Sequence, residues 1–235
     1  MICHIEQHGR LEYAEGLELQ DTRVRQRKAG EIGDTLILLE HPHVYTLGRN
    51  ARREHLLAAP EALARLGAAV YETNRGGDVT YHGPGQLVGY PIFDLARHRR
   101  DIAWYMRSLE EVFIRVAADF GISAGRVPGC TGVWVGGEKL VALGVHISRW
   151  VTSNGFALNV NTDLHYFTHI IPCGIPDRGV TSLEKLLGTR VDMEHAKQRV
   201  ICRFGDVFGM DMRAEEQLPV APSPAALTKQ YSAAP

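Results

Sequence analysis

Residues 131–147 read TGVWVGGEKLVALGVHI, two apolar, β-branched runs separated by Gly136 and Gly137. Val, Ile and Trp are enriched in strands, and a Gly-Gly pair suits the two-residue turn of a hairpin. The stretch therefore predicts an antiparallel β-hairpin with a long second strand. NGFALNVN at residues 154–161 predicts a further strand, so this half of the chain favours a sheet.

Helices and strands follow one another irregularly in the rest of the chain. Apolar residues recur at spacings of three and four from Ile102 to Phe120, after the N-capping residue Asp101 and before Gly121, which predicts a core-facing helix. A capping box of Thr181 and Glu184 predicts a short helix that ends at Gly188. Further helices are expected over residues 11–28, 60–66 and 193–208, and strands over residues 2–5, 69–72 and both halves of 34–50. Because strands and helices do not alternate regularly, the expected fold class is α+β, a mixed sheet flanked by helices.

The overall composition is typical of a soluble globular protein, with 45% hydrophobic and 23% charged residues. The formal net charge of −1 favours neither a nucleic acid nor a membrane surface as the partner. No apolar run approaches the ~20 residues of a spanning helix, and the N-terminus lacks a signal-peptide pattern, so a cytoplasmic protein is expected. Residues 1–213 are expected to form one catalytic domain, and residues 214–235 a Pro/Ala-rich tail.

Cys173 is the most nucleophile-like of the four cysteines. It lies in HIIPCGIPD, residues 169–177, between two prolines that exclude both helix and interior strand. The cysteines are too far apart for a zinc site or a disulfide scaffold, so we expect free thiols and no metal. Burial explains the other three, Cys3, Cys130 and Cys202. A reactive thiol needs a neighbouring base, and spacing does not rank the candidates His82, His146, His165, His169 and Lys139.

Lys139 begins the second strand of the predicted hairpin. In a regular strand it shares a face with Val141, Leu143, Val145 and Ile147. Desolvation on such a face makes a lysine usable as an acid or base near neutral pH. The alternative is that Lys139, close to the turn, extends into water as most lysines do.

A glycine-rich stretch, NRGGDVTYHGPGQLVGYPI at residues 74–92, holds the densest polar chemistry. Arg75, Gly76 and Gly77 offer a cation and backbone N–H groups without intervening side chains, which suits close approach to a ligand. The stretch matches neither the P-loop nor the dinucleotide fingerprint. A purely structural hairpin connection is the alternative reading.

Five blocks together resemble, in order, the lipoyl(octanoyl) transferase family: HPHVYTLGR at 41–49, RGGDVTYHGPGQLVGYPI at 75–92, the hairpin block, NGFALNVNTDL at 154–164, and PCGI at 172–175 followed by GVTSL at 179–183. The resemblance implies the single-domain fold of lipoate and biotin protein ligases. It implies transfer of an octanoyl group from octanoyl-acyl carrier protein to a lysine of a lipoyl domain, the first step of endogenous protein lipoylation. Cys173 matches the family's acyl-thioester nucleophile, and Lys139 matches the lysine that activates it.

The same resemblance implies the remaining site residues and partners. The acceptors would be the lipoyl domains of 2-oxoacid dehydrogenase complexes and the glycine cleavage H protein, and no cofactor is expected because a thioester is already activated. Cys130 and His43 fall at positions taken to be variable. Basic runs at 23–28 and 97–101 are candidate docking sites for an acidic carrier. The substrate-binding residues implied are Arg75, Gly76, Gly77, Asp78, Val79, Thr80, Tyr81, His82, Ala142, Leu143, Gly144, Gly155, Phe156 and Ala157.

Two rival functions differ from this one in chemistry. An ATP-dependent lipoate or biotin-type ligase of the same fold activates a free acid as an adenylate and needs no cysteine. A binding module for the carrier or the lipoyl domain would have lost catalysis, which the presence of both Cys173 and Lys139 argues against.

Overall fold

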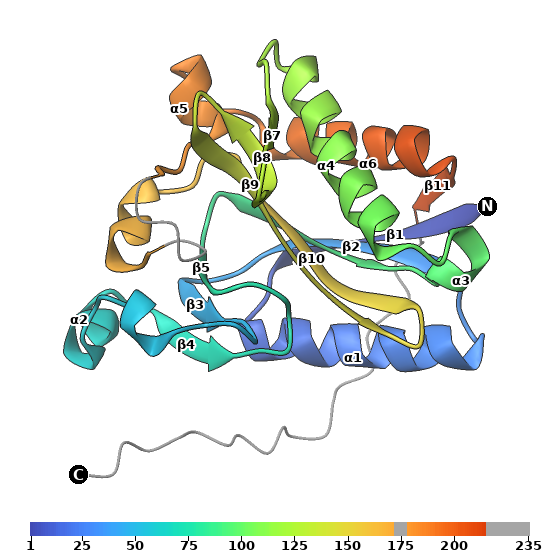
Figure 1. Cartoon of the computed structure of the whole chain (residues 1–235), viewed down its shortest axis with the longest axis horizontal. Coiled ribbons are helices and arrows are strands. Elements are labelled where there is room, and N and C mark those ends of the chain that lie inside the picture. The colour runs from blue at the N-terminus through green and yellow to red at the C-terminus, as the bar shows by residue number, and fades with distance from the viewer. Residues whose placement is uncertain (172–177, 215–235) are drawn as a thin grey trace.

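A large and a small β-sheet form the centre of the molecule in the computed structural model, which describes residues 1–171 and 178–214 (Figure 1). The large sheet has the strand order β11-β1-β2-β6-β10-β9-β8-β7, and the small sheet has the order β4-β3-β5. Parallel pairs, β1 with β2 and with β11, stand beside antiparallel pairs, so the large sheet is mixed. The strands are β1 (Ile2–Arg10), β2 (Asp34–Glu40), β3 (Val44–Leu47), β4 (Ala69–Glu72), β5 (Val79–His82), β6 (Gln86–Ile92), β7 (Gly125–Val127), β8 (Cys130–Val135), β9 (Glu138–Ser148), β10 (Val151–Asn159) and β11 (Asp211–Ala214).

Helices cover both faces of the large sheet (Figure 1). The long helix α1 crosses one face, and α4 and α6 pack together on the other. Within the part of the chain described here, no helix is long and apolar enough to cross a bilayer. The helices are α1 (Tyr13–Ala29), α2 (Pro60–Arg65), α3 (Leu95–His98), α4 (Ile102–Asp119), α5 (Leu183–Leu187) and α6 (Met193–Phe208), with short 3₁₀ turns η1 (Arg53–His55) and η2 (Leu164–His169).

Helix α4 confirms the expectation from its apolar spacing. The Asp101 carboxylate accepts a hydrogen bond from the Trp104 N–H at 2.9 Å and so caps the helix. Its apolar stripe, which includes Leu109 and Phe113, is buried against the sheet and α6. Each such side chain contributes about 1.5–3 kcal/mol on burial, so packing rather than helix propensity stabilises this element.

The predicted hairpin is β8–β9, and it is followed by a second hairpin, β9–β10. Gly136 and Gly137 take φ angles of 56° and 88°, the left-handed values that the first turn requires. In the second hairpin Ala142 lies opposite Ala157 and Gly144 opposite Gly155. This row of small residues lies on the face that α1 covers.

The apolar run at 34–50 forms two strands as expected, β2 in the large sheet and β3 in the small one. One local expectation needs correction. The capping box at Thr181 was wrong: Ser182 caps α5, its hydroxyl accepting from the Lys185 N–H at 3.1 Å. Thr181 is displaced from the cap because its own N–H donates to the Lys139 carbonyl at 3.0 Å.

Candidate active site

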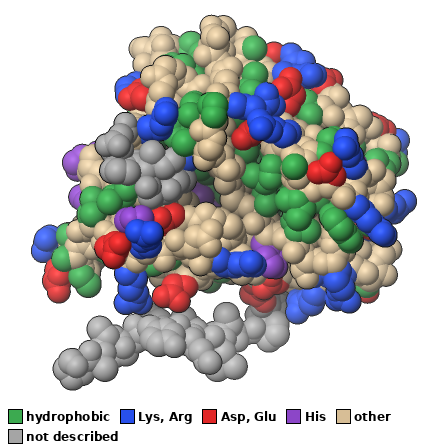
Figure 2. Space-filling model, viewed as in Figure 1, with side chains coloured by type: hydrophobic (Ala, Val, Ile, Leu, Met, Phe, Trp, Pro, Cys, Tyr) green, Lys and Arg blue, Asp and Glu red, His purple; other side chains and the backbone are tan. Residues whose placement is uncertain are grey.

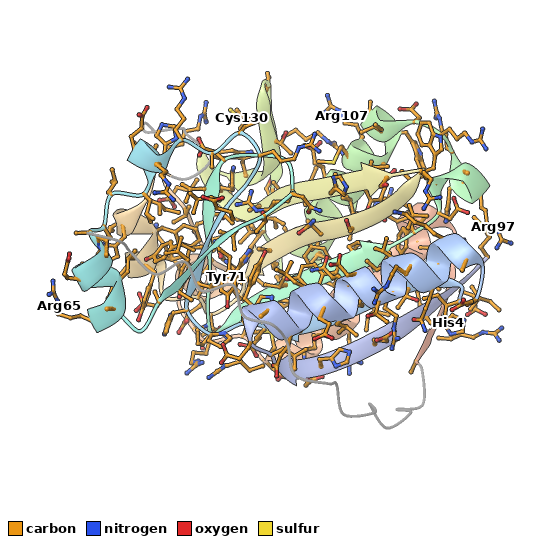
Figure 3. The ribbon with its side chains drawn as sticks, turned by 90° about the horizontal axis from the view of Figure 1, so that it is seen from below. His4, Arg65, Tyr71, Arg97, Arg107 and Cys130 are labelled. Atoms are coloured by element: carbon orange, nitrogen blue, oxygen red, sulfur yellow. The ribbon has the colours of Figure 1, made fainter. Side chains whose placement is uncertain are left out.

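A pocket lies between the large sheet, the start of α1 and the segment that leads into β5. Its floor consists of residues from β6, β9 and β10, with the side chains of Val88, Tyr90, Ala142 and Ala157 on it. The glycine-rich segment from Arg75 onward forms its roof. Viewed from below, α1 crosses in front of the strands, and Tyr71, whose ring lies 5.0 Å from that of Tyr13, is at the start of α1 (Figure 3).

Glycines bring the roof and floor together. A Cβ on Gly144 would lie 3.1 Å from the carbonyl oxygen of Gly76 in the roof. Within the floor, a Cβ on Gly155 of β10 would lie 2.3 Å from the carbonyl oxygen of Gly89 on the neighbouring strand β6. The Gly76 N–H donates to the Val145 carbonyl at 3.0 Å, which ties the roof to β9. A side chain at Gly144 would therefore push the roof away from the floor, and one at Gly155 would push β10 away from β6.

Arg75 holds the roof onto the small sheet. Its buried guanidinium donates to the carbonyl of Thr46 at 2.6 Å and to the hydroxyl of the same residue at 2.9 Å. It also donates to the Gly76 carbonyl at 3.1 Å. The cation is thus used to shape the loop that faces the pocket.

The structure brings most of the residues implied by the resemblance to this pocket. Strand alternation turns Thr80 and His82 toward it, while Val79 and Tyr81 pack on the opposite side of β5 in a separate apolar cluster. The residues that line it are Arg75, Gly77, Asp78, Thr80, His82, Ala142, Leu143, Gly144, Gly155, Phe156 and Ala157. Sequence reasoning missed Tyr13, Val88, Tyr90 and Asn154, which also line it. Val88 and Tyr90 alternate along the apolar run at 86–92, a period-two signal that could have placed them on one face of a strand.

A buried chain of side-chain amides connects the pocket to the strand of Lys139. The Gln86 amide N–H₂ donates to Asn159 Oδ1 at 2.9 Å, and Asn159 Nδ2 donates to the Thr181 carbonyl at 2.9 Å. Because a carbonyl only accepts, the direction of both amides is set, and Gln86 Oε1 accepts from His82 Nδ1 at 2.7 Å. His82 is therefore the tautomer with the proton on Nδ1.

Two buried histidines stay neutral at ordinary pH. Burial lowers the pKa of His82 to about 3 and that of His41 to about 4. His41 Nε2 lies 2.6 Å from the Tyr90 hydroxyl and its Nδ1 lies 2.8 Å from the Leu11 carbonyl. The His82 ring lines the pocket, and the His41 ring lies behind it against the hydroxyl of the lining residue Tyr90; neither ring is a cation.

Lys139 is buried, with 6% of its surface exposed, and its ammonium lies 4.7 Å from the centre of the Trp134 ring. The alternative reading, a lysine extended into water, is therefore wrong. The Lys139 N–H donates to the Gly179 carbonyl at 2.9 Å. Residues just after Cys173 in the sequence thus run along β9 at Lys139.

Cys173 itself lies outside the described residues, but both flanks of its segment are placed. On one side the Ile171 N–H donates to the His55 carbonyl at 2.8 Å, and Leu56 and Ile170 form an antiparallel bridge. His55 Nδ1 lies 2.5 Å from Asp78 Oδ2, so this flank is tied to a residue of the pocket roof. On the other side of the segment, residues 179–181 form the backbone bridge to Lys139.

The remaining cysteines lie in settings that differ from one another. Burial raises the pKa of the Cys3 thiol, which is fully enclosed in the core. Cys130 begins β8 at the edge of the molecule, far from Tyr71 at the start of α1 (Figure 3). Cys202 is exposed on α6. None of these three lines the pocket.

On the face shown in Figure 2, acidic and basic side chains are interspersed. The basic run at 23–28 is partly used inside the molecule, because Arg27 forms a buried ion pair with Asp34 at 2.8 Å and Arg23 pairs with Glu6 at 2.6 Å. The run at 97–101 keeps exposed arginines at positions 97, 99 and 100. Of the two candidate docking runs, the second is the more available.

Comparison with known proteins gives a consistent set of likenesses. The family described as lipoyl protein ligase A/B catalytic domain matches residues 12–205. A relative from Solibacter usitatus, named octanoyltransferase, is 53% identical over 210 residues, which are 89% of this chain and 94% of the relative. An octanoyltransferase from Caldicellulosiruptor saccharolyticus is 51% identical over 214 residues, 90% of each chain.

Solved structures share the fold at low sequence identity. The bipartite lipoate protein ligase of Thermoplasma acidophilum superposes with a TM-score of 0.69 at 16% identity, covering 90% of this chain and 87% of that one. The biotin protein ligase of Aquifex aeolicus gives 0.51 at 12% identity, covering 89% and 70%. The expected α+β fold shared with lipoate and biotin ligases is confirmed.

Proposed function

This chain belongs to the octanoyltransferase family, within the lipoyl protein ligase A/B catalytic domain, and we propose that it transfers an octanoyl group from octanoyl-acyl carrier protein to a lysine of lipoyl domains through a thioester on Cys173. Identity of 53% over 89% of the chain is the observation that carries this function. The acceptors proposed are the lipoyl domains of 2-oxoacid dehydrogenase complexes and the glycine cleavage H protein, and the enzyme acts in the cytoplasm.

The first half of the reaction acylates the enzyme. Lys139 takes the proton of the Cys173 thiol, and the thiolate attacks the carbonyl carbon of the carrier thioester. A new sulfur–carbon bond forms, the bond to the carrier sulfur breaks, and Lys139 returns the proton to the departing thiolate. The backbone bridge between β9 and residues 179–181 supports this pairing, because it brings the chain just after Cys173 to Lys139.

The second half deacylates it. The neutral amine of the target lysine attacks the Cys173 thioester, the carbon–sulfur bond breaks, and an amide forms. The proton released from the amine passes through Lys139 to the cysteine sulfur, which restores the starting state. No nucleotide is consumed, since the thioester supplies the driving force.

The pocket supports an alkyl chain as the bound group. Its floor is small and apolar along Ala142, Gly144 and Ala157, with Val88 beside them. A slot of this kind discriminates chain length by only about 1–3 kcal/mol per methylene, so the preference for eight carbons is graded.

The test is intact-mass measurement of the protein after mixing with octanoyl-carrier in the absence of ATP. An added octanoyl mass is expected on the wild type and on Cys130→Ala, and none on Cys173→Ala. Subsequent addition of a lipoyl domain should move the mass to that domain. Modification of the domain only with free octanoate plus ATP would identify a ligase instead, and an adduct that persists in Cys173→Ala would place the nucleophile elsewhere.

A further inference from the structure

Two cations lie over the ring of one buried tryptophan, Trp134 of β8, which is 4% exposed. The Lys139 ammonium lies 4.7 Å from the ring centre, and the guanidinium carbon of Arg178 lies 5.5 Å from it. Both distances are within the about 6 Å over which an aromatic face attracts a cation. The two charges are therefore within about 10 Å of each other, close to one Debye length at ordinary ionic strength.

Strand pairing fixes the tryptophan ring beside the lysine. The Trp134 Nε1–H donates to the Cys130 carbonyl at 3.3 Å, and Trp134 lies opposite Lys139 across β8 and β9. The preceding residue, Val133, lies opposite Val141, which packs in the core on the other face of the sheet. The shift of register between these two pairs therefore separates Lys139 from the apolar row with which a regular strand would group it, and turns it toward the ring.

Gly132 leaves the space that the lysine stem occupies. A Cβ on Gly132 would lie 2.6 Å from the Val141 carbonyl oxygen and 3.5 Å from Cε of Lys139. Its φ of 121° is also in the region that favours glycine. The stem of Lys139 thus passes beside Gly132, and its ammonium ends on the ring of Trp134.

Arg178 reaches the same ring from a different segment of the chain. It immediately precedes Gly179, whose carbonyl accepts from the Lys139 N–H at 2.9 Å. A Cβ on Gly137 would lie 4.0 Å from Arg178 Nη1, so the guanidinium lies near the turn of the β8–β9 hairpin. The backbone bridge therefore holds the second cation at Trp134.

We propose that Trp134 is a positioning residue for the transfer, and that its ring and Arg178 act on Lys139 in opposite senses. The inference rests on the proposed role of Lys139 as the group that takes and returns the proton. The negative face of the ring attracts the ammonium and fixes the position of its nitrogen. The guanidinium stays cationic at every ordinary pH and repels that ammonium.

An aromatic face suits a lysine that must change its charge twice in each reaction cycle. A carboxylate takes up N–H groups in charge-assisted hydrogen bonds and so favours a permanent ion pair. The ring attracts the charge without binding a proton, and the nearby guanidinium weakens the net attraction. Lys139 is thereby held in place and is still able to pass between ammonium and amine.

The test measures how deacylation depends on pH, because Cys173 is then acylated and Lys139 alone of the two groups titrates. Octanoyl-enzyme is mixed with a lipoyl domain after replacement of the tryptophan at position 134 by its mono-, di- and trifluorinated forms. Fluorine withdraws charge from the ring face with little change of shape, so the ammonium is held less tightly. The lower limb of the pH profile should move to lower pH with each fluorine, by about one pH unit across the series. Ionisation of the target lysine is common to all forms, so differences between the profiles report on Lys139.

Matched variants separate the ring from its surroundings. Fluorination of Trp104 on α4, whose ring centre lies 5.8 Å from that of Phe208, should leave the profile unchanged. Arg178→Met should move the lower limb to higher pH, because the repelling charge is gone, and Arg178→Lys should restore the wild-type profile. Arg190→Met, at an exposed position later in the same part of the chain, should have no effect.

A second measurement uses Trp134→Leu, which should lower the plateau rate of deacylation about tenfold or more through misplacement of the lysine. In Lys139→Met the same change should have no further effect, because the ring acts through the ammonium; equal slowing in both backgrounds would show a purely structural role. A limb that stays in place through the fluorinated series overturns the role of Trp134, and the transferase function stands if the octanoyl adduct still forms on Cys173. A limb unchanged in Arg178→Met overturns the opposing role of Arg178. Absence of the Cys173 adduct in the wild type overturns the proposed function, and this inference with it.

Discussion

Lys139 and Thr181 are joined through their backbones, the Thr181 N–H donating to the Lys139 carbonyl at 3.0 Å. Residues on either side of Val180 thus form a short parallel bridge with β9. The nucleophile proposed at Cys173 is far from Lys139 in sequence, and this bridge places residues 179–181, which follow it along the chain, beside the lysine.

Replacing Asn159 by alanine should loosen that bridge. The change removes the donor to the Thr181 carbonyl and the acceptor for Gln86, leaving buried polar groups unpaired. We expect a loss of about 1–3 kcal/mol in the free energy of unfolding, measured with urea, and slower acylation of Cys173. Asn161→Ala is the control, because Asn161 makes two similar bonds to the Val191 backbone at 2.8 and 2.9 Å away from Lys139. Equal slowing of acylation in both variants would contradict a positioning role for Asn159.

Lys139→Met should impair the chemical step, because it removes the ammonium that lies over Trp134 while keeping an unbranched side chain at this buried position. Loss of a general acid–base typically lowers the rate by about 10²–10⁴. Single-turnover acylation by octanoyl-carrier measures this directly. Lys185→Met removes an exposed lysine that pairs with Glu138 at 2.8 Å, and it should keep the wild-type rate. A wild-type rate in Lys139→Met would remove Lys139 from the mechanism.

The pair of His55 and Asp78 should position the other flank of the Cys173 segment. His55→Ala leaves the Asp78 carboxylate without its partner, so acylation should slow with little change in the affinity for the lipoyl domain. His55→Asn should recover part of the rate, because the asparagine amide can donate from near the Nδ1 position. Arg53→Ala is the control on the same short 3₁₀ turn, where Arg53 is exposed and pairs with Glu72 at 3.4 Å.

A double-mutant cycle tests whether His55 and Asp78 act on acylation together. Contact between the two side chains predicts a coupling of about 0.5–3 kcal/mol in the acylation barrier for His55→Ala with Asp78→Ala. Additive effects would show that His55 and Asp78 act independently.

Stability should fall as the solution is acidified below pH 6.5. Burial holds the folded pKa of His41 at about 4 and that of His82 at about 3, below the ordinary value of 6.5, so the unfolded chain takes up protons that the folded chain does not. Each histidine then removes at most about 1.4 kcal/mol per pH unit, with the contribution complete above pH 6.5 and lost toward pH 4 and 3. Urea unfolding at pH 7, 6 and 5 should show this slope, and a smaller one in His41→Gln. His195→Gln, at an exposed position on α6, should retain the wild-type slope; an unchanged slope in His41→Gln would contradict the assignment.

Helices and turns were predictable where residues close together in the sequence specify them. The apolar spacing after Asp101 and the glycines at 136 and 137 specify a helix and a turn through interactions a few residues apart. The predicted N-cap of α5 was one residue too early, because Thr181 forms a backbone hydrogen bond with the distant strand β9. Propensity does not register such long-range hydrogen bonds.

The candidate site shows the same division. The roof residues from Arg75 to His82 stand together in the sequence, and the resemblance found them as one block. Tyr13 and Asn154 were missed, since they reach the pocket only when α1 packs across β10. Whether the odd- or the even-numbered residues of a strand face the pocket was decided by the pairing of that strand with a neighbour far along the chain.

The amino-acid sequence by itself determined the helices, the hairpins and the two chemical groups of the proposed reaction, because caps, turns and side-chain identity are local properties. Only the tertiary structure decided that β2 and β3 enter different sheets, that Lys139 is buried over Trp134, and that Asn154 lines the pocket. These depend on strand register and on burial, which exist only once residues distant along the chain have packed together.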